Sequence, residues 1–258
     1  MPTWDPNQYV KFLDERTQPS RDLCARIPLA APARVLDVGC GPGNSTRVLR
    51  ERWPGAKVAG LDNSREMVDR ARADCPEGDW ILADAASFEP AGDWEVVVSN
   101  AALQWLPDHD RLLPRLLGWV APGGCLAVQM PARGASPFRS SIQAVAQRPR
   151  WREALAGATE SLTFLGARAY YDLLAPVAAR LEMWETIYYH VLDSHQGLVD
   201  WYAGTGMRPC LDRLPDPADR AEFQAEVLDG CIEEYPAAAD GKVLMPFRRL
   251  FFLAWTAR

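Results

Sequence analysis

Short apolar runs alternate with amphipathic segments through the first half of the chain. The runs have the length of buried strands, and the segments between them repeat apolar residues at helical spacing. The predicted strands cover residues 34–38, 57–61, 80–82, 95–99 and 125–130. The predicted helices cover residues 4–23, 44–53, 64–73 and 109–120. Asn44 or Ser45 is expected to cap the second of these helices, Ser64 opens the third, and Pro122-Gly123-Gly124 closes the fourth. Strands that alternate with helices are joined by right-handed crossovers, so this half predicts a doubly wound, mostly parallel α/β sheet.

The pattern is looser after residue 137. Residues 183–192 predict a strand, because Ile187, Tyr189 and Val191 fall on one of its faces. Helices are expected at 138–147, 195–202 and 217–235, a helical or irregular segment up to 168, and a final strand at 250–256. We expect the last two strands to join the same sheet. Residues 195–245 between them are then a helical insertion.

The most informative motif follows the first predicted strand. Residues 35–44 read V-L-D-V-G-C-G-P-G-N, with glycines at alternate positions that allow a tight turn and a close approach to a ligand. The dinucleotide fingerprint is G-x-G-x-x-G, whereas this loop is G-x-G-x-G with Asp37 just ahead of it. A carboxylate suits a ligand that carries an ammonium group and is poorly placed beside a pyrophosphate. The loop therefore predicts a site for the methionyl part of S-adenosylmethionine.

Polar residues also follow the next predicted strands. Asp62 ends the second strand, where a carboxylate grips ribose hydroxyls, and Asp84 follows the third, where it can accept from an adenine amine. Ser99-Asn100-Ala101 follows the fourth strand and is expected to close over the methionyl end. The residues expected at the cofactor are Asp37, Gly39, Cys40, Gly41, Asn44, Asp62, Asn63, Met67, Asp84, Ala85, Asn100, Ala101, Gln104 and Trp105. Cys40 is expected to fill the glycine turn rather than to act as a nucleophile.

Charge and composition exclude several other classes of protein. The net charge is −6, and the excess of acidic residues lies in residues 151–258, so nucleic acid and membrane surfaces are not expected partners. Six scattered cysteines without a C-x-x-C pair, and three histidines without a metal motif, predict reduced thiols and no metal. The sequence shows neither the pattern of a secretory leader nor that of a membrane span, so a cytoplasmic location is expected.

The chain resembles the family of trans-aconitate 2-methyltransferases, within the class I S-adenosylmethionine-dependent methyltransferases, along nearly its whole length. The matching stretches are W-D-P-N-Q-Y at 4–9, L-D-V-G-C-G-P-G-N-S-T at 36–46, S-N-A-A-L-Q-W-L-P-D-H at 99–109, L-A-V-Q-M-P at 126–131, A-Y-Y-D-L-L at 169–174, Y-Y-H at 188–190, S-H-Q, D-W and T-G-M-R-P within 194–209, and F-R-R-L-F at 247–251. The resemblance implies a seven-stranded Rossmann-like sheet. It also implies transfer of a methyl group to a carboxylate of trans-aconitate, giving a monomethyl ester and S-adenosylhomocysteine.

The resemblance also divides the chain and suggests an acceptor site. An N-terminal helical lid is expected over 1–30, a cofactor-binding core over 31–135, and substrate-recognition helices that cap the active site, with the last strands, over 136–258, all in one structural domain. The residues expected at the acceptor are Tyr9, Tyr171, Tyr189, Arg208 and Arg249. The planar guanidinium groups suit carboxylates, although a surface arginine paired with a nearby acid is the simpler interpretation. Arg248 stands where the family pattern often has proline, which makes Arg249 the matching arginine.

The reaction that the resemblance implies needs no catalytic base. A carboxylate has a pKa of about 4 and is already ionised at neutral pH. The histidines at positions 109, 190 and 195 are therefore expected to form hydrogen bonds or to cap helices. Two alternatives stay open: a carrier-bound dicarboxylate as acceptor, as in malonyl-acyl carrier protein methylation, and a cofactor-binding protein or nicotinamide-dependent oxidoreductase without transferase activity. A monomer or weak homodimer is expected.

Overall fold

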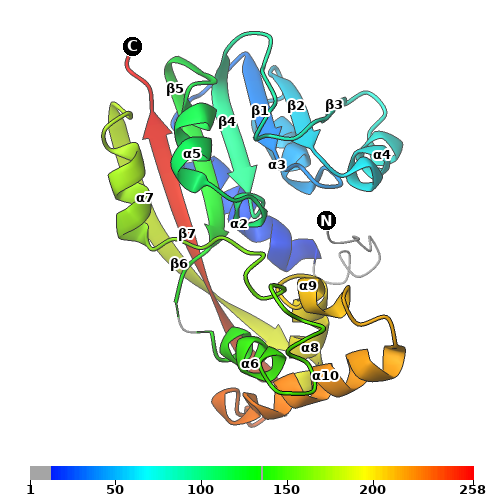
Figure 1. Ribbon diagram of the computed structural model, residues 1–258. Helices are drawn as coiled ribbons and strands as arrows, with labels where there is room; N and C mark the ends of the chain where they lie inside the picture. The colour runs from blue at the N-terminus through cyan, green and yellow to red at the C-terminus, as the bar shows by residue number, and fades with distance from the viewer. Residues whose placement is uncertain (1–12, 135) are drawn as a thin grey trace. The chain divides into compact units, whose positions relative to one another are not determined.

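A single seven-stranded sheet has the strand order β3-β2-β1-β4-β5-β7-β6 in the computed structural model, which describes residues 13–134 and 136–258 (Figure 1). The strands are β1 Arg34–Val38, β2 Lys57–Asp62, β3 Asp79–Leu82, β4 Trp94–Asn100, β5 Val120–Pro131, β6 Arg180–Leu192 and β7 Val243–Trp255. The first five strands are parallel, and β7 pairs with β5 in the antiparallel sense. The doubly wound, mostly parallel sheet predicted from the sequence is confirmed.

The chain divides into two compact units, which are described separately. The sheet unit contains Asp14–Arg133, Thr163–Thr186 and Arg249–Arg258. The helical unit contains, among its described residues, Leu13, Gly134, 136–162 and Ile187–Arg248. The N-terminal lid and the cap over the active site that the sequence suggested stay predictions.

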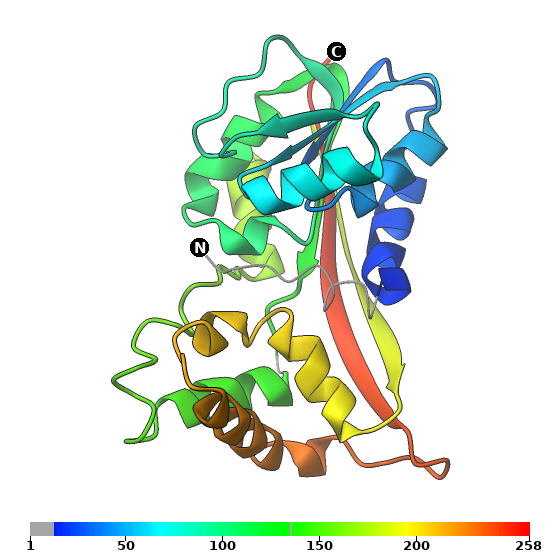
Figure 2. The same cartoon turned by 90° about the vertical axis from the view of Figure 1, so that its right-hand side faces the viewer.

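Helices cover both faces of the sheet unit. They are α2 Leu13–Arg26, α3 Asn44–Arg52, α4 Arg65–Asp74, η1 Leu103–Trp105, α5 His109–Leu117 and α7 Ala167–Leu174. Figure 2 shows α2 and α3 on one side of the strands and α5 and α7 on the other. Leu36, Val128 and Phe252 point from the sheet into one apolar cluster with Leu113 of α5 and Tyr170 of α7. This face of the sheet is therefore closed by packing, which leaves the ends of the strands for ligands.

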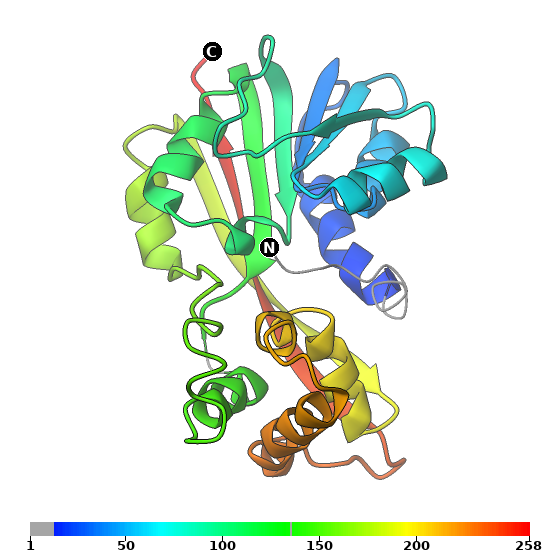
Figure 3. The ribbon, with the colours of Figure 1, turned by 45° about the vertical axis from the view of Figure 1, so that its right-hand side comes forward.

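The helical unit has a core of its own. Its helices are α6 Pro137–Ala146, α8 His195–Ala203, α9 Arg208–Leu211, α10 Pro217–Asp229 and η2 Ile232–Glu234 (Figure 3). Phe138 of α6 stacks on Tyr202 of α8 with ring centroids 4.4 Å apart. Trp151 meets Phe223 of α10 edge to face, with centroids 5.6 Å apart. Such aromatic pairs add to the apolar area that the helices bury together.

Several predicted elements differ from the observed ones at their ends. Strand β7 starts seven residues before the expected 250, and its first residues alternate between buried and exposed positions, whereas the predicted strand covered only the continuously buried run that follows Arg249. Strand β5 starts at Val120 and includes the Pro-Gly-Gly turn expected to close a helix, with an irregular register beside Trp94. The helix expected over 217–235 ends at Asp229, followed by Gly230. Helix α7 begins at Ala167, at the very end of the segment expected to be helical or irregular, and continues beyond it to Leu174.

The starts of α3 and α4 differ in how they are capped. Gly43 rather than Asn44 or Ser45 occupies the N-cap position of α3, with φ 93°, so the expected side-chain cap is wrong. Ser64 does cap α4, accepting the Met67 N–H at 3.3 Å. The helix expected over 4–23 is described from Leu13 and continues to Arg26; its first part lies outside the described residues.

Candidate active site

The glycine loop that follows β1 is tied to the end of β2. The N–H groups of Gly39 and Cys40 donate to the Leu61 carbonyl at 2.7 and 3.0 Å. Gly39 has a φ of 74°, and a Cβ atom on it would lie 2.1 Å from the Ala102 Cβ. A glycine is therefore required where the loop after β1 meets the loop after β4.

Asp37 is the most unusual group in this loop. Its side chain is fully buried, and its Oδ2 accepts hydrogen bonds from the hydroxyls of Ser45 and Thr46, both at 2.6 Å. The Oδ1 atom is also buried and has no hydrogen-bond partner among the described residues. Burial raises the pKa of this carboxyl to about 6, against the lowering effect of the two hydroxyls. Ser45 thus binds Asp37 instead of capping α3.

Asp62 organises the neighbouring turn. Its Oδ2 accepts the Gly41 N–H and its Oδ1 accepts the Ser64 N–H, each at 2.9 Å. Burial raises the pKa of this carboxyl too. A carboxylate offers about four acceptor positions, so these two backbone bonds leave lone pairs for a ligand. Asp62 holds the glycine loop in place whether or not it also binds a ribose.

The other predicted residues near β2 and β3 are arranged around the same edge. Asp84 is exposed and accepts the Ala86 N–H at 2.9 Å, and Ala85 beside it is buried. Met67 is buried, whereas Asn63 is exposed and Asn44 is half-buried at the start of α3.

Cys40 has a packing role. Its side chain is 3% exposed, and burial raises the pKa of the thiol well above its usual range, so a reactive thiolate is disfavoured. The ring of Trp80 also packs here: a Cβ atom on Gly43 or Gly60 would lie 2.7 or 2.6 Å from it.

The turn after β4 carries the next predicted group. Ala101 has a φ of 54°, a left-handed conformation that is uncommon for a residue with a side chain. Its N–H donates to the Gln129 carbonyl at 2.8 Å, and its carbonyl accepts from the Gln104 side-chain amide at 2.7 Å. The Asn100 Oδ1 and the Gln104 Oε1 are buried without a partner among the described residues. Trp105 is half-buried in the same turn.

His109 holds this turn in place through hydrogen bonds from both of its ring nitrogens. One ring nitrogen lies 2.9 Å from the Leu103 carbonyl and the other lies 2.9 Å from the Tyr170 hydroxyl. The Leu165 N–H also donates to that hydroxyl at 3.4 Å, and burial raises the pKa of Tyr170 to about 12. His109 is thus a hydrogen-bonding residue, as the sequence suggested, and it positions the η1 turn that contains Gln104.

The five residues expected at the acceptor have different surroundings. Arg249 is 6% exposed and lies opposite Pro131 in the pairing of β5 with β7. Arg208 begins α9 and forms an ion pair with Asp212, with its Nε 2.8 Å from the carboxylate. Tyr171 and Tyr189 are 50% and 62% exposed, on α7 and β6. Tyr9 lies outside the described residues. Of the four that the structure describes, Arg249 is the buried one, and it belongs to the sheet unit.

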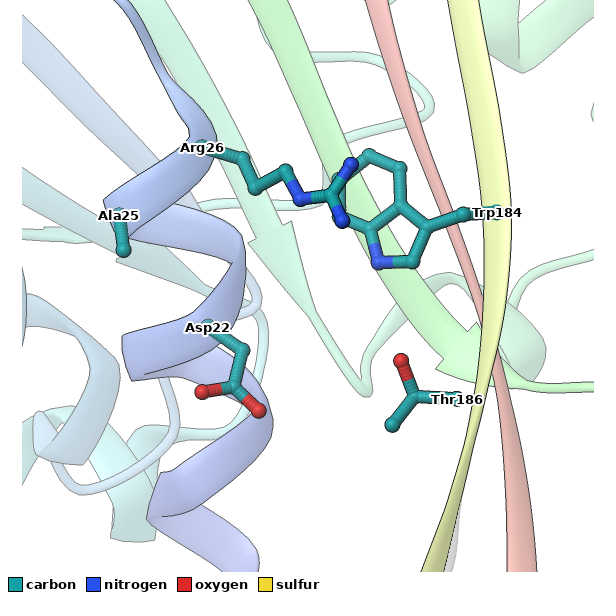
Figure 4. Close-up of a pocket in the computed structure, with 5 residues that line it drawn as sticks. All are labelled: Asp22, Ala25, Arg26, Trp184 and Thr186. Atoms are coloured by element: carbon teal, nitrogen blue, oxygen red, sulfur yellow. The ribbon is translucent and has the colours of Figure 1, made fainter.

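A separate cavity of about 510 Å³ lies between α2 and β6. It is lined by Asp22, Ala25, Arg26, Trp184 and Thr186 (Figure 4). The Arg26 guanidinium lies over the Trp184 ring, 4.5 Å from its centroid, an ordinary cation–π contact. None of the residues predicted from the glycine loop lines this cavity, so the candidate active site stays at the carboxyl ends of the parallel strands.

Within residues 13–134 and 136–258, no cluster of three or more His, Cys, Asp or Glu side chains is arranged to hold a metal ion. Within the same ranges, the helices are too short or too polar to cross a membrane.

The fold and the glycine loop match a known class of enzyme. A methyltransferase-domain family model matches residues 9–177. The YcgJ protein of Bacillus subtilis has a TM-score of 0.64 to this chain at 14% identity, over 93% of this chain and 99% of that one. A Haemonchus contortus phosphoethanolamine N-methyltransferase 2, solved in complex with S-adenosyl-L-methionine, has a TM-score of 0.60 at 15% identity, over 93% and 53%. The chain belongs to the methyltransferase-domain family and has the class I methyltransferase fold.

Full-length relatives narrow this assignment. A trans-aconitate 2-methyltransferase of Azoarcus sp. (strain BH72) is 47% identical over 98% of this chain and 99% of the relative. One of Methylobacterium nodulans is 48% identical over the whole of both chains. This chain is a member of the trans-aconitate 2-methyltransferase family.

Proposed function

We propose that this protein transfers a methyl group from S-adenosylmethionine to a carboxylate of trans-aconitate, giving a monomethyl ester and S-adenosylhomocysteine. The full-length identity to trans-aconitate 2-methyltransferases supports the acceptor. The observation that carries the proposal is a set of buried polar atoms at the carboxyl ends of the strands that have no hydrogen-bond partner among the described residues. They belong to Asp37 on β1, Asn100 on β4, Gln104 on η1 and Gln129 on β5.

The residues at this edge fit S-adenosylmethionine. The Oδ1 of Asp37, which no described residue binds, suits the ammonium group of the methionyl tail, because a buried carboxylate is stabilised by a cation. Gly39 and Gly41 let the backbone approach a ligand closely, and the remaining lone pairs of Asp62 suit ribose hydroxyls. Asp84, beyond β3, is the corresponding acceptor for an adenine amine.

When bound, S-adenosylmethionine supplies an electrophilic methyl group on a sulfonium, whose carbon–sulfur bond breaks with its electron pair left on sulfur as the new carbon–oxygen bond forms. The protein has to align the acceptor and to exclude water. It need not move a proton, because the acceptor oxygen is already anionic. Closeness and orientation account for most of the acceleration in such a reaction. No catalytic base is assigned.

Arg249 is the residue we assign to a non-reacting carboxylate of the acceptor. It is nearly buried in a sheet strand, and a guanidinium there can bind a carboxylate through two parallel N–H groups. Arg208 and the tyrosines at 9, 171 and 189 stay predicted acceptor contacts.

The proposal is tested by transfer of a labelled methyl group to trans-aconitate and to crotonate, a monocarboxylate. We expect wild type to methylate trans-aconitate and to discriminate strongly against crotonate. Arg249→Lys keeps the charge but loses the planar pair of donors, so kcat/KM for trans-aconitate should fall about ten- to a hundredfold, the worth of one charge-assisted bond. The affinity for S-adenosylmethionine should change little.

Two results would contradict parts of this proposal. Wild type that leaves trans-aconitate unmethylated removes the proposed acceptor. Equal losses on both acids in Arg249→Lys remove the assigned role of the arginine while leaving the reaction itself intact.

A further inference from the structure

Gln129 is a buried amide on β5 that lies in the L-A-V-Q-M-P stretch but is not among the residues expected at the cofactor or the acceptor. Its side chain is 0% exposed, and neither its Oε1 nor its Nε2 has a hydrogen-bond partner among the described residues. Its neighbours along the strand, Val128 and Met130, are apolar. Burying an amide without hydrogen bonds is unfavourable, and an apolar side chain of similar size would be more stable there. A ligand that bonds to the amide would explain its presence.

The strand pairing places Gln129 in a row of polar residues. Gln129 is paired with Asn100 in one neighbouring strand, β4, and with Phe251 in the other neighbouring strand, β7. Residues that face each other in neighbouring strands point to the same side of a sheet, and so do residues two positions apart. Arg249, two residues from Phe251, therefore shares the face that carries Asn100 and Gln129.

The opposite face belongs to the apolar core, which identifies the side on which the row lies. Val128 and Met130 belong to the cluster that contains residues of α5 and α7. Phe251 stacks on Trp184, with ring centroids 5.0 Å apart, and Trp184 lies against Arg26 of α2. The polar row therefore lies on the α2 side of the sheet.

The order of the strands puts Gln129 between two sets of groups with different predicted ligands. Asp37 and Asn100, expected at the cofactor, lie on β1 and β4, and Arg249, expected at the acceptor, lies on β7. Gln129 lies on β5, between β4 and β7. Its backbone carbonyl also accepts the Ala101 N–H, which fixes it to the turn after β4. Methyl donor and acceptor have to meet between these two sets.

We propose that the Gln129 side-chain N–H donates to the carboxylate of the acceptor that receives the methyl group. This inference rests on the proposed function. A neutral amide orients a carboxylate while leaving most of its negative charge available for attack. A guanidinium stabilises the anion more strongly and lowers its nucleophilicity. Gln129 and Arg249 together therefore select which carboxylate is esterified: the one at the amide reacts, and one at the arginine is held.

The test uses Gln129→Met, which keeps the length of the side chain and removes its hydrogen bonds. We expect kcat/KM for trans-aconitate to fall at least about tenfold, the affinity for S-adenosylmethionine to stay within about twofold, and the melting temperature not to fall. The residual product should be a mixture of monomethyl esters by NMR, where wild type gives one. Gln129→Glu, which adds a negative charge, should weaken acceptor binding further.

Met130→Leu is the matched control, because Met130 is the next residue and faces the apolar core. It should leave both kcat/KM and the ester product unchanged. The inference is overturned if wild type is active and Gln129→Met gives the same single ester at unchanged kcat/KM. It is also overturned if cofactor affinity and activity fall by the same factor. An inactive wild type instead overturns the proposed function, and calorimetric titration of trans-aconitate into the S-adenosylhomocysteine complex separates the two failures.

Discussion

The carboxyl edge of the sheet and the α6–α10 contact treat their buried polar groups differently. At the edge, Asp37 and Gln129 bury side-chain atoms that no described residue binds. Between the two helices, the Ser141 hydroxyl of α6 donates to the Val227 carbonyl of α10 at 2.6 Å, and the indole of Trp151, which follows α6, donates to Glu226 of α10 at 3.2 Å. Protein interiors normally satisfy such groups. The buried groups without partners at the carboxyl edge therefore indicate where the chain gives up stability for ligand binding. The hydrogen-bonded groups of the α6–α10 contact indicate a region that stabilises the fold.

The largest effect is expected from Gly39→Ala at the edge. The added Cβ would lie 2.1 Å from the Ala102 Cβ, at a φ of 74°, so two loops must separate. We expect a loss of about 2–5 kcal/mol in unfolding free energy and about a hundredfold weaker S-adenosylmethionine binding. Denaturant unfolding and calorimetry measure the two quantities.

Gly41→Ala is the control for this change. Gly41 also has a positive φ, 54°, but an added Cβ would have no atom within 4 Å. Only backbone strain of about 1–2 kcal/mol is then expected. Equal destabilisation by the two variants would show that the contact with Ala102 is unimportant.

A smaller effect is expected from the pH dependence of cofactor binding. Burial raises the pKa of Asp37 to about 6 in the free protein, and a bound ammonium group favours its charged form. S-adenosylmethionine binding should therefore release a proton, and its affinity should be about tenfold weaker at pH 5 than at pH 7. For the free protein the sign is opposite. Protonated Asp37 favours folding below about pH 4, and this contribution is lost as the pH rises through about 6.

Asp37→Asn should remove most of this pH dependence. Asp62, whose pKa is also raised, accepts a hydrogen bond from the Gly41 N–H of the same loop, and Asp62→Asn measures its share. An affinity that stays constant from pH 5 to 7 in wild type would mean that Asp37 does not meet the ammonium group.

The smallest effect is expected on the satisfied side of the comparison. Ser141→Ala removes the bond to the Val227 carbonyl and leaves that acceptor unpaired. The unfolding free energy should fall by about 1 kcal/mol, and S-adenosylmethionine affinity should be unchanged. A change in S-adenosylmethionine affinity with no loss of unfolding free energy would contradict the assignment of this contact to stability alone.

Local patterns were sufficient to predict the sheet and the glycine loop. Alternating strands and helices determine the crossovers, and the motif around Asp37 needs only neighbours in sequence. Gln129 was missed because a single polar residue in an apolar run gives no periodic signal. Its meaning depends on Asn100 and Phe251, which pairing brings beside it from distant parts of the chain. The role of Ser45 was misjudged for a related reason, since its bond to Asp37 competes with a local cap.

The position of β7 has a consequence for synthesis on the ribosome. It is the last of the seven strands along the chain, yet it lies between β5 and β6. Cys125–Pro131 of β5, which pair with β7, are therefore an open edge until residue 255 is made. At about 5–20 residues per second this takes roughly 6–25 s. An unpaired strand edge readily binds other chains. For those seconds the nascent protein depends on its surroundings, such as chaperones, to keep the gap in its sheet from being filled by the wrong strand.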